Sequence, residues 1–223
     1  MLKELFDLFR KESQLNQAFD RSWEMLKEDR EMLVEAMRSL RERDDARLEL
    51  DIYAKDQLIN AYEREVRRKV FTHLAVTHDR DLHASLVLVS VVIDIERIGD
   101  YTKNIVELAL HHPQRLGAGP FEPTLKKIET TVKTMFALLI DALPVNDEAK
   151  AREVMSEHWW ISRKAEEIIT TLIEKNEPGL TCREAVTTAM YARYLKRVSA
   201  HLMNIASSVV NPFDRIGFRG NNS

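Results

Sequence analysis

The sequence predicts an all-α protein made of two tandem three-helix bundles, with six long helices in total. Gly and Pro are scarce, at six residues each in 223, whereas charged residues make up 31% of the chain. This balance favours long helices over a turn-rich β architecture. Apolar residues recur at three- and four-residue steps through most of the chain, as they do in amphipathic helices. The second half also repeats part of the first, which indicates an internal duplication.

Three helices are expected in the first half, because apolar residues keep a helical spacing in three stretches. The charged patch 41–45 separates the first stretch from the second. Short acidic side chains in the segment 77–81 can accept hydrogen bonds from first-turn amides, so the third helix is expected to begin there. The expected ranges are 2–40, about 46–76, and from that cap to about His111.

The only dense cluster of Gly and Pro lies between the two halves and predicts a linker. The predicted organisation is a first repeat at 1–112, a linker at 113–123, a second repeat at 124–211 and a C-terminal tail at 212–223.

Three further helices are expected in the second half. The first covers residues 124–143, and the next begins at Asn146 or Asp147 and runs to about Lys175. The last begins at Thr181, where Thr181 and Glu184 have the spacing of a capping box. It ends at Asn211-Pro212, because proline cannot continue the helical hydrogen bonds.

The duplication is most visible in residues 96–105, which match residues 196–205 at a constant offset of 100. Both segments have Arg in second place and Asn-Ile at the end. The match predicts that these segments occupy equivalent places in the two bundles.

Composition excludes several classes of function. The net charge is −3 with both signs interleaved, so nucleic-acid binding is not expected. The longest apolar run, 86–93, is far shorter than the roughly 20 residues that span a bilayer, so no membrane-spanning helix is predicted. The single cysteine, Cys182, can form no internal disulfide and lacks zinc-ligand spacing, which favours a cytoplasmic protein. No hydrolase or metalloprotease motif is present, so the chain is not expected to be an enzyme.

A stripe of oxygen-bearing side chains is the feature most indicative of function. Glu96, Asp100, Asn104 and Glu107 lie three or four residues apart and share one face of the third helix. Such oxygen-rich groups suit hard cations such as Mg²⁺ and Mn²⁺, and also iron, if a second helix supplies further ligands. The alternative is an ordinary solvated face that a neighbouring cation neutralises.

The second helix offers a matching stripe of Asp56, Asn60 and Glu63. Two such stripes facing each other would form an open oxygen site. Gly99 adds weight to this interpretation, because a glycine inside a helix costs about 1 kcal/mol relative to alanine and usually reflects close packing or access.

The segment Asp94-Ile95-Glu96-Arg97-Ile98-Gly99-Asp100, followed by Asn104-Ile105 and Glu107, resembles the signature of the PhoU family of phosphate-uptake regulators. The segment 55–60 resembles the family's second-helix motif. The resemblance implies a pseudo-twofold pair of three-helix bundles, metal bound by helix carboxylates, and a regulatory role. It also implies two kinds of partner, a phosphate transporter component and a membrane sensor kinase. The sequence leaves open whether the chain forms a homodimer.

Carried over by position, the resemblance implies one metal site in the first repeat, for a divalent or iron-type ion (Fe, Mn, Mg or Zn). The main ligands would be Glu96 and Asp100, joined by Asp56 and by Asn60, where the family more often has an acid. Glu63 and Asp94 are weaker candidates.

The second repeat departs from the family pattern, so no second metal cluster is expected. Lys196 and Ala200 stand where the paired acids belong, and His158 and Ser162 stand where the middle helix should supply acids.

Two other functions remain to be weighed. A carboxylate-bridged di-iron enzyme would need Glu-x-x-His motifs, and no Glu in this chain is followed three residues later by His. A protein-interaction adaptor that binds no metal is the stronger alternative, because the second repeat lacks the ligand pattern.

Overall fold

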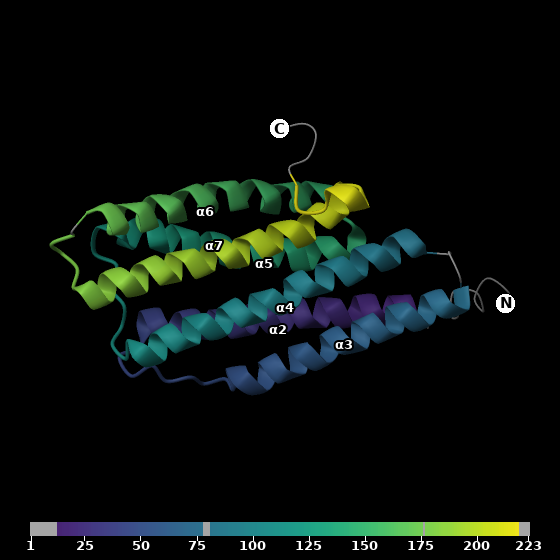
Figure 1. Ribbon diagram of the computed structural model, residues 1–223, viewed down its shortest axis with the longest axis horizontal. Coiled ribbons are helices and arrows are strands. Elements are labelled where there is room, and N and C mark those ends of the chain that lie inside the picture. Colours follow the sequence, from purple (N-terminus) through teal and green to yellow (C-terminus); the bar gives the residue numbers. More distant parts are fainter. Residues whose placement is uncertain (1–12, 78–80, 176, 219–223) are drawn as a thin grey trace.

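The computed structural model describes residues 13–77, 81–175 and 177–218. Within these ranges the chain folds into six long helices, which confirms the predicted fold class (Figure 1). They are α2 (Gln14–Glu42), α3 (Ile52–Thr77), α4 (Leu82–His111), α5 (Glu122–Ala142), α6 (Glu148–Glu174) and α7 (Cys182–Val210). None of the helices in the described ranges combines the length and hydrophobicity of a membrane-spanning segment.

Side-chain caps set several helix ends. Thr181 and Glu184 form the predicted capping box, and Asp147 is the N-cap of α6, accepting a hydrogen bond from the amide of Lys150. At the start of α3, the side chain of Asp51 accepts from the amide of Ala54 at 2.9 Å. This cap explains why α3 begins later than the predicted residue 46.

The predicted cap of α4 is the exception. Asp81 occupies the N-cap position, but it has left-handed backbone angles and its side chain makes no cap hydrogen bond. The carboxylate lies instead 3.2 Å from Nε2 of His73 on α3. Residues 78–80 lie outside the described residues, as do residues 2–12 of the predicted first helix and 219–223 of the predicted tail.

Outside the long helices, the described residues include three short 3₁₀ turns. η1 (Gly119–Phe121) lies in the predicted linker, whose last two residues already belong to α5. η2 (Leu143–Val145) joins α5 to α6, and η3 (Phe213–Arg215) follows α7.

Each half is a three-helix bundle, and the two bundles bury equivalent positions. α2 packs with α3 and α4, whereas α5 packs with α6 and α7. Residues 91–100 and 191–200 have the same order of buried, half-buried and exposed side chains, residue for residue. The duplication seen in the sequence is therefore also present in the packing.

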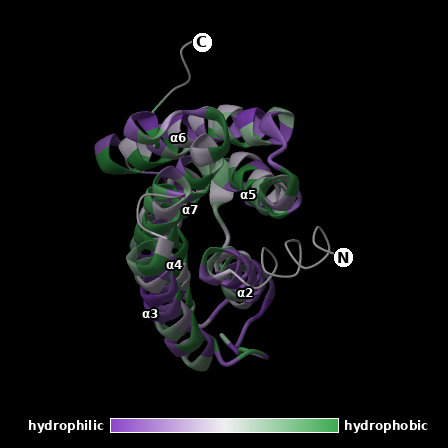
Figure 2. Cartoon of the chain, turned by 90° about the vertical axis from the view of Figure 1, so that its right-hand side faces the viewer, coloured by the Kyte–Doolittle hydropathy of each residue, from purple (hydrophilic) through white to green (hydrophobic). Residues whose placement is uncertain are grey.

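The two bundles lie side by side along their length, with α4 against α7 and α2 against α5 (Figure 2). On the α2 side, the buried Arg41 guanidinium binds Glu122 at 2.6 Å and Glu129 at 2.7 Å. The indole N–H of Trp23 donates to the carbonyl of Ile140 at 2.9 Å. The charge-assisted contacts of Arg41, made in a desolvated setting, fix the orientation of one bundle against the other.

Candidate functional site

Four carboxylates gather where α2, α3 and α4 meet, and we call them the carboxylate cluster. α2 supplies Asp29, α3 supplies Asp56, and α4 supplies Glu96 and Asp100. Gly99 makes this approach possible. A Cβ atom at Gly99 would stand 3.2 Å from Oδ1 of Asp29 and 3.6 Å from Oδ1 of Asp56. The glycine therefore lets two acids lie against the backbone of α4.

Asp29 is the member of the cluster that the sequence analysis missed. Its side chain is fully buried, and neither carboxyl oxygen has a hydrogen-bond partner among the residues that the structure describes. Burial raises the pKa of Asp29 well above its usual value, and the charges of Asp56 and Glu96 raise it further. The carboxyl group therefore disfavours ionisation unless a cation approaches it.

A signal for Asp29 was present in the sequence. Asp29 lies on the apolar stripe of α2, between the buried residues Met25, Met32 and Leu33. An acid at a core position of an amphipathic helix is a better site candidate than an acid on a charged face.

Two cationic side chains contact the cluster. Nζ of Lys103 lies 3.0 Å from Oδ2 of Asp56 and 3.0 Å from Oδ1 of Asp100. Arg97 reaches Asp100 at 3.0 Å and Glu96 at 3.6 Å from a more exposed position. Burial raises the pKa of Glu96, as does Asp100, while Arg97 partly opposes the shift. The cluster is thus only partly neutralised, and Asp29 forms no ion pair with any residue in the described ranges.

The structure brings together some of the sequence-predicted ligands and separates others. Asn60 lies beside Asp56 and donates a hydrogen bond to its Oδ2 at 3.1 Å. Glu63 forms an ion pair with Arg67 at 2.7 Å, although its charge still acts on Glu96.

Asp94 lies apart from the cluster, in the contact between the two bundles. Its Oδ1 is 2.7 Å from Nδ1 of His201 and accepts from the side-chain amide of Asn204 at 2.9 Å. Asp94 and Glu96 are two residues apart, which turns their side chains about 200° from each other around α4. The placement therefore assigns Asp94 to the interface between the bundles.

The cluster has the chemistry of a cation site, in a form that is not assembled. Carboxylates from three helices and the unpaired oxygens of Asp29 are what a hard cation would bind. Within the described residues, however, no three His, Cys, Asp or Glu side chains are positioned to hold a metal ion as they stand. A hollow of about 460 Å³ opens beside Asp56 and Asp100 and also reaches Lys103 and Glu107.

The second bundle has no acid at the positions that match the four members of the carboxylate cluster. The buried positions of α2 match buried positions of α5 that lie 103 places later in the chain. They are 22, 25, 29, 32, 33 and 36 in α2 and 125, 128, 132, 135, 136 and 139 in α5. Val132 therefore occupies the position that matches Asp29. His158 and Ser199 replace Asp56 and Gly99, with Nδ1 and Oγ 3.0 Å apart. Burial, together with the charges of Lys196 and Arg197, lowers the pKa of His158 to about 4.

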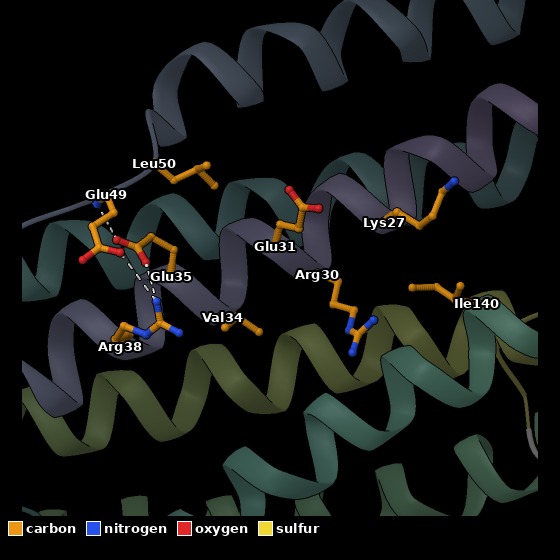
Figure 3. Close-up of a pocket in the computed structure, with 9 residues that line it drawn as sticks. All are labelled: Lys27, Arg30, Glu31, Val34, Glu35, Arg38, Glu49, Leu50 and Ile140. Atoms are coloured by element: carbon orange, nitrogen blue, oxygen red, sulfur yellow. Dashed lines mark hydrogen bonds and ion pairs between the residues drawn. The ribbon is translucent and has the colours of Figure 1, made fainter.

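A second hollow, of about 580 Å³, lies along α2 beside the 43–51 loop and α5 (Figure 3). Its acids are already engaged: Glu35 binds Arg43 at 2.7 Å, and Glu31 binds Lys55 at 3.1 Å. Burial alone would raise the pKa of Glu35, but the Glu49 amide and Arg43 outweigh it and hold the pKa below its usual value. This groove therefore offers a cation no free carboxylate comparable to Asp29.

Comparison with known proteins identifies the fold and the repeat. The family described as the PhoU domain matches the chain twice, at residues 23–109 and 125–209. The chain is 23% identical over 185 residues to the phosphate-specific transport system accessory protein PhoU homolog of Clostridium acetobutylicum. The match covers 80% of this chain and 82% of that protein.

Two solved structures share the architecture. The crystal structure of PhoU from Pseudomonas aeruginosa has a TM-score of 0.77 at 22% identity and covers 90% of this chain and 97% of its own. The phosphate transport system regulatory protein PhoU from Streptococcus pneumoniae has a TM-score of 0.76 at 20% identity and covers 88% and 93%. At these identities the likeness establishes the fold alone.

Proposed function

Since this chain belongs to the PhoU family, we propose that it is a non-enzymatic regulator of phosphate transport whose first bundle binds a metal ion. The family match over both bundles supports the regulatory role. The observation that carries the metal proposal is Asp29, a fully buried carboxylate without a partner among three other acids. We place its action in the cytoplasm, on a phosphate transporter component or a membrane sensor kinase, with a homodimer as one form to be tested.

The residues that would hold the ion are Asp29, Asp56, Glu96 and Asp100, with Asn60 beside Asp56 and Glu63 near Glu96. Their oxygen donors suit Mn²⁺, Mg²⁺ or Fe²⁺ better than a soft ion, while Zn²⁺ also accepts carboxylates. A bound ion would neutralise the cluster and join α2, α3 and α4. In a regulator, that would change the stability or shape of the bundle rather than supply reaction chemistry.

Metal content of the purified protein tests the site. We expect bound Mn²⁺, Fe²⁺, Mg²⁺ or Zn²⁺ by elemental analysis in the wild type, and loss of it in Asp29→Asn and Asp100→Ala. Asp141→Ala is the matched control, because Asp141 is an exposed carboxylate of the second bundle that pairs with Lys150. Equal metal content in wild type, Asp29→Asn and Asp100→Ala would contradict the assignment.

Phosphate uptake in cells tests the regulatory role. Deleting the gene should disturb the control of uptake by external phosphate, and the wild-type gene should restore it. Uptake that is unchanged by deletion at both high and low phosphate would count against a transport regulator.

An adaptor that works without metal is the second candidate function. The contact of Lys103 with both Asp56 and Asp100 favours it, because an ammonium already joins α3 and α4. Co-purification with transporter subunits distinguishes the two. A metal-dependent regulator should lose its partner in EDTA, whereas a metal-free adaptor should retain it.

A further inference from the structure

The position of Lys103 bears directly on the carboxylate cluster. Its ammonium lies 3.0 Å from an oxygen of Asp56 on α3 and 3.0 Å from an oxygen of Asp100 on α4. The side chain is 24% exposed, so this contact is partly shielded from water. One flexible cation thus occupies the place between two helices where a metal ion would meet the same two oxygens.

Building on the proposed metal site, we propose that Lys103 is an internal competitor for the ion, which joins α3 to α4 in its absence and leaves when it binds. Lysine suits this role, because it presents a compact charge on a flexible stem that can move without disturbing the helix. Arg97 cannot act in the same way. Within the described residues it pairs with the two acids of its own helix, Glu96 and Asp100, and not with Asp56.

Asp29 supplies the reason why an ion would displace the lysine. In the presence of Lys103, both oxygens of Asp29 remain buried and unpaired. A lone ammonium therefore leaves the most desolvated acid of the cluster uncompensated. A divalent ion brings twice the charge and several ligand positions, so it can engage Asp29 together with Asp56 and Asp100. A monovalent ion gains no charge in this exchange, so Lys103 favours ions of charge two or more.

Glu107 is positioned to receive the displaced ammonium. It stands one turn after Lys103 on α4, at the i,i+4 spacing at which Lys and Glu attract each other. Glu107 is exposed and forms no ion pair within the part of the chain that the structure describes. Both side chains line the 460 Å³ hollow beside Asp56 and Asp100, so Lys103 has open space in which to move.

Isothermal titration calorimetry of the metal-stripped protein with Mn²⁺ tests the proposal. Lys103→Met should bind Mn²⁺ about tenfold more tightly than wild type, which corresponds to ~1.4 kcal/mol. It should also lower the melting temperature in EDTA, because the ammonium that joins Asp56 and Asp100 is gone. Lys103→Arg keeps the charge and should not gain affinity, and Glu107→Gln should weaken Mn²⁺ binding a few-fold.

Lys69→Met is the matched control. Lys69 also joins two helices of the first bundle, through Gln17 and Glu65, but it does not contact the cluster. It should leave Mn²⁺ affinity unchanged. Tighter binding in Lys103→Met alone supports the competition. Equal affinity in wild type and Lys103→Met would overturn the role of Lys103 and leave the metal site standing. Absence of Mn²⁺ binding in wild type, Lys103→Met and Lys69→Met would overturn both the metal site and the role of Lys103.

Discussion

In the first bundle, Gly99 and Asp100 of α4 face Asp29 and Asp56. In the second bundle, Ser199 and Ala200 stand at the positions that match Gly99 and Asp100. Val132 and His158 stand at those that match Asp29 and Asp56. The backbone frame and the burial pattern are the same in both. In the second bundle this position holds the His158–Ser199 hydrogen bond and the aliphatic side chain of Val132. In the first bundle it holds acids. The fold therefore does not need a charged centre, and we expect the acids of the first bundle to lower its stability when no cation is bound.

Two further side chains extend the comparison. Lys196 takes the place of Glu96 and forms an ion pair with Glu166 of α6. Lys103 forms the equivalent link from α4 to Asp56 of α3 in the first bundle. Both bundles thus use a lysine to join their second and third helices, but within the described residues only the lysine of the first bundle contacts a cluster that includes a buried acid without a partner, Asp29.

Transferring the acid to the second bundle is the strongest test of this contrast. Val132→Asp should lower the free energy of unfolding by about 3–5 kcal/mol, because it buries a carboxylate without a cation. Urea unfolding in EDTA measures the change. Val132→Thr adds only a hydroxyl group and should cost about 1–2 kcal/mol. A loss below about 1 kcal/mol for Val132→Asp would show that this position can hold an acid and that the two bundles differ less than their side chains suggest.

The acid response of His158 should be the next largest effect. Because burial lowers its folded-state pKa from 6.5 to about 4, the neutral form stabilises the fold above pH 6.5. This stability is lost as the pH falls from 6.5 to about 4. The loss reaches about 3 kcal/mol, at ~1.4 kcal/mol per pKa unit. Urea unfolding of wild type and His158→Gln between pH 7.5 and 4 should show a smaller acid loss in the variant. Parallel curves would show that His158 titrates normally.

Removing the acid from the first bundle should have the opposite sign to Val132→Asp. Asp29→Val copies the residue of the second bundle and should raise the free energy of unfolding in EDTA by about 1–3 kcal/mol, because it removes an unsatisfied buried carboxyl. The same variant should lose metal. If Asp29→Val instead destabilised the metal-free protein, the carboxyl would have a partner in solution that outweighs its burial.

Substitutions of Gly99 and Ser199, which stand at matching positions, should change the stability least. Ser199→Gly loses helix propensity and the hydrogen bond to His158, with an expected cost of about 1–1.5 kcal/mol. Gly99→Ala should change stability by less than about 0.5 kcal/mol, because the gain in helix propensity opposes a 3.2 Å contact with Asp29. Thermal unfolding of both variants measures this. A cost above 2 kcal/mol for Gly99→Ala would mean that Asp29 cannot yield to a methyl group.

Much of the fold followed from local patterns in the sequence. Helix periods, the capping box at Thr181 and the cap at Asp147 depend on neighbouring residues, and the structure confirms them. The match of residues 96–105 with 196–205 predicted the repeat for the same reason. The late start of α3 was not predicted, because the cap at Asp51 competed with a helical pattern that runs through the preceding loop.

The sequence by itself determined the six helices, the duplication and the acids of α4, because each rests on spacing along one helix. Only the tertiary structure decided which acids meet. It brought Asp29 to Gly99 from a helix about 70 residues earlier in the chain, a separation that no helical spacing relates. It sent Asp94 to His201 across the interface between the bundles, and it set Lys103 between Asp56 and Asp100. These outcomes depend on distances between helices, which the packing of whole bundles sets.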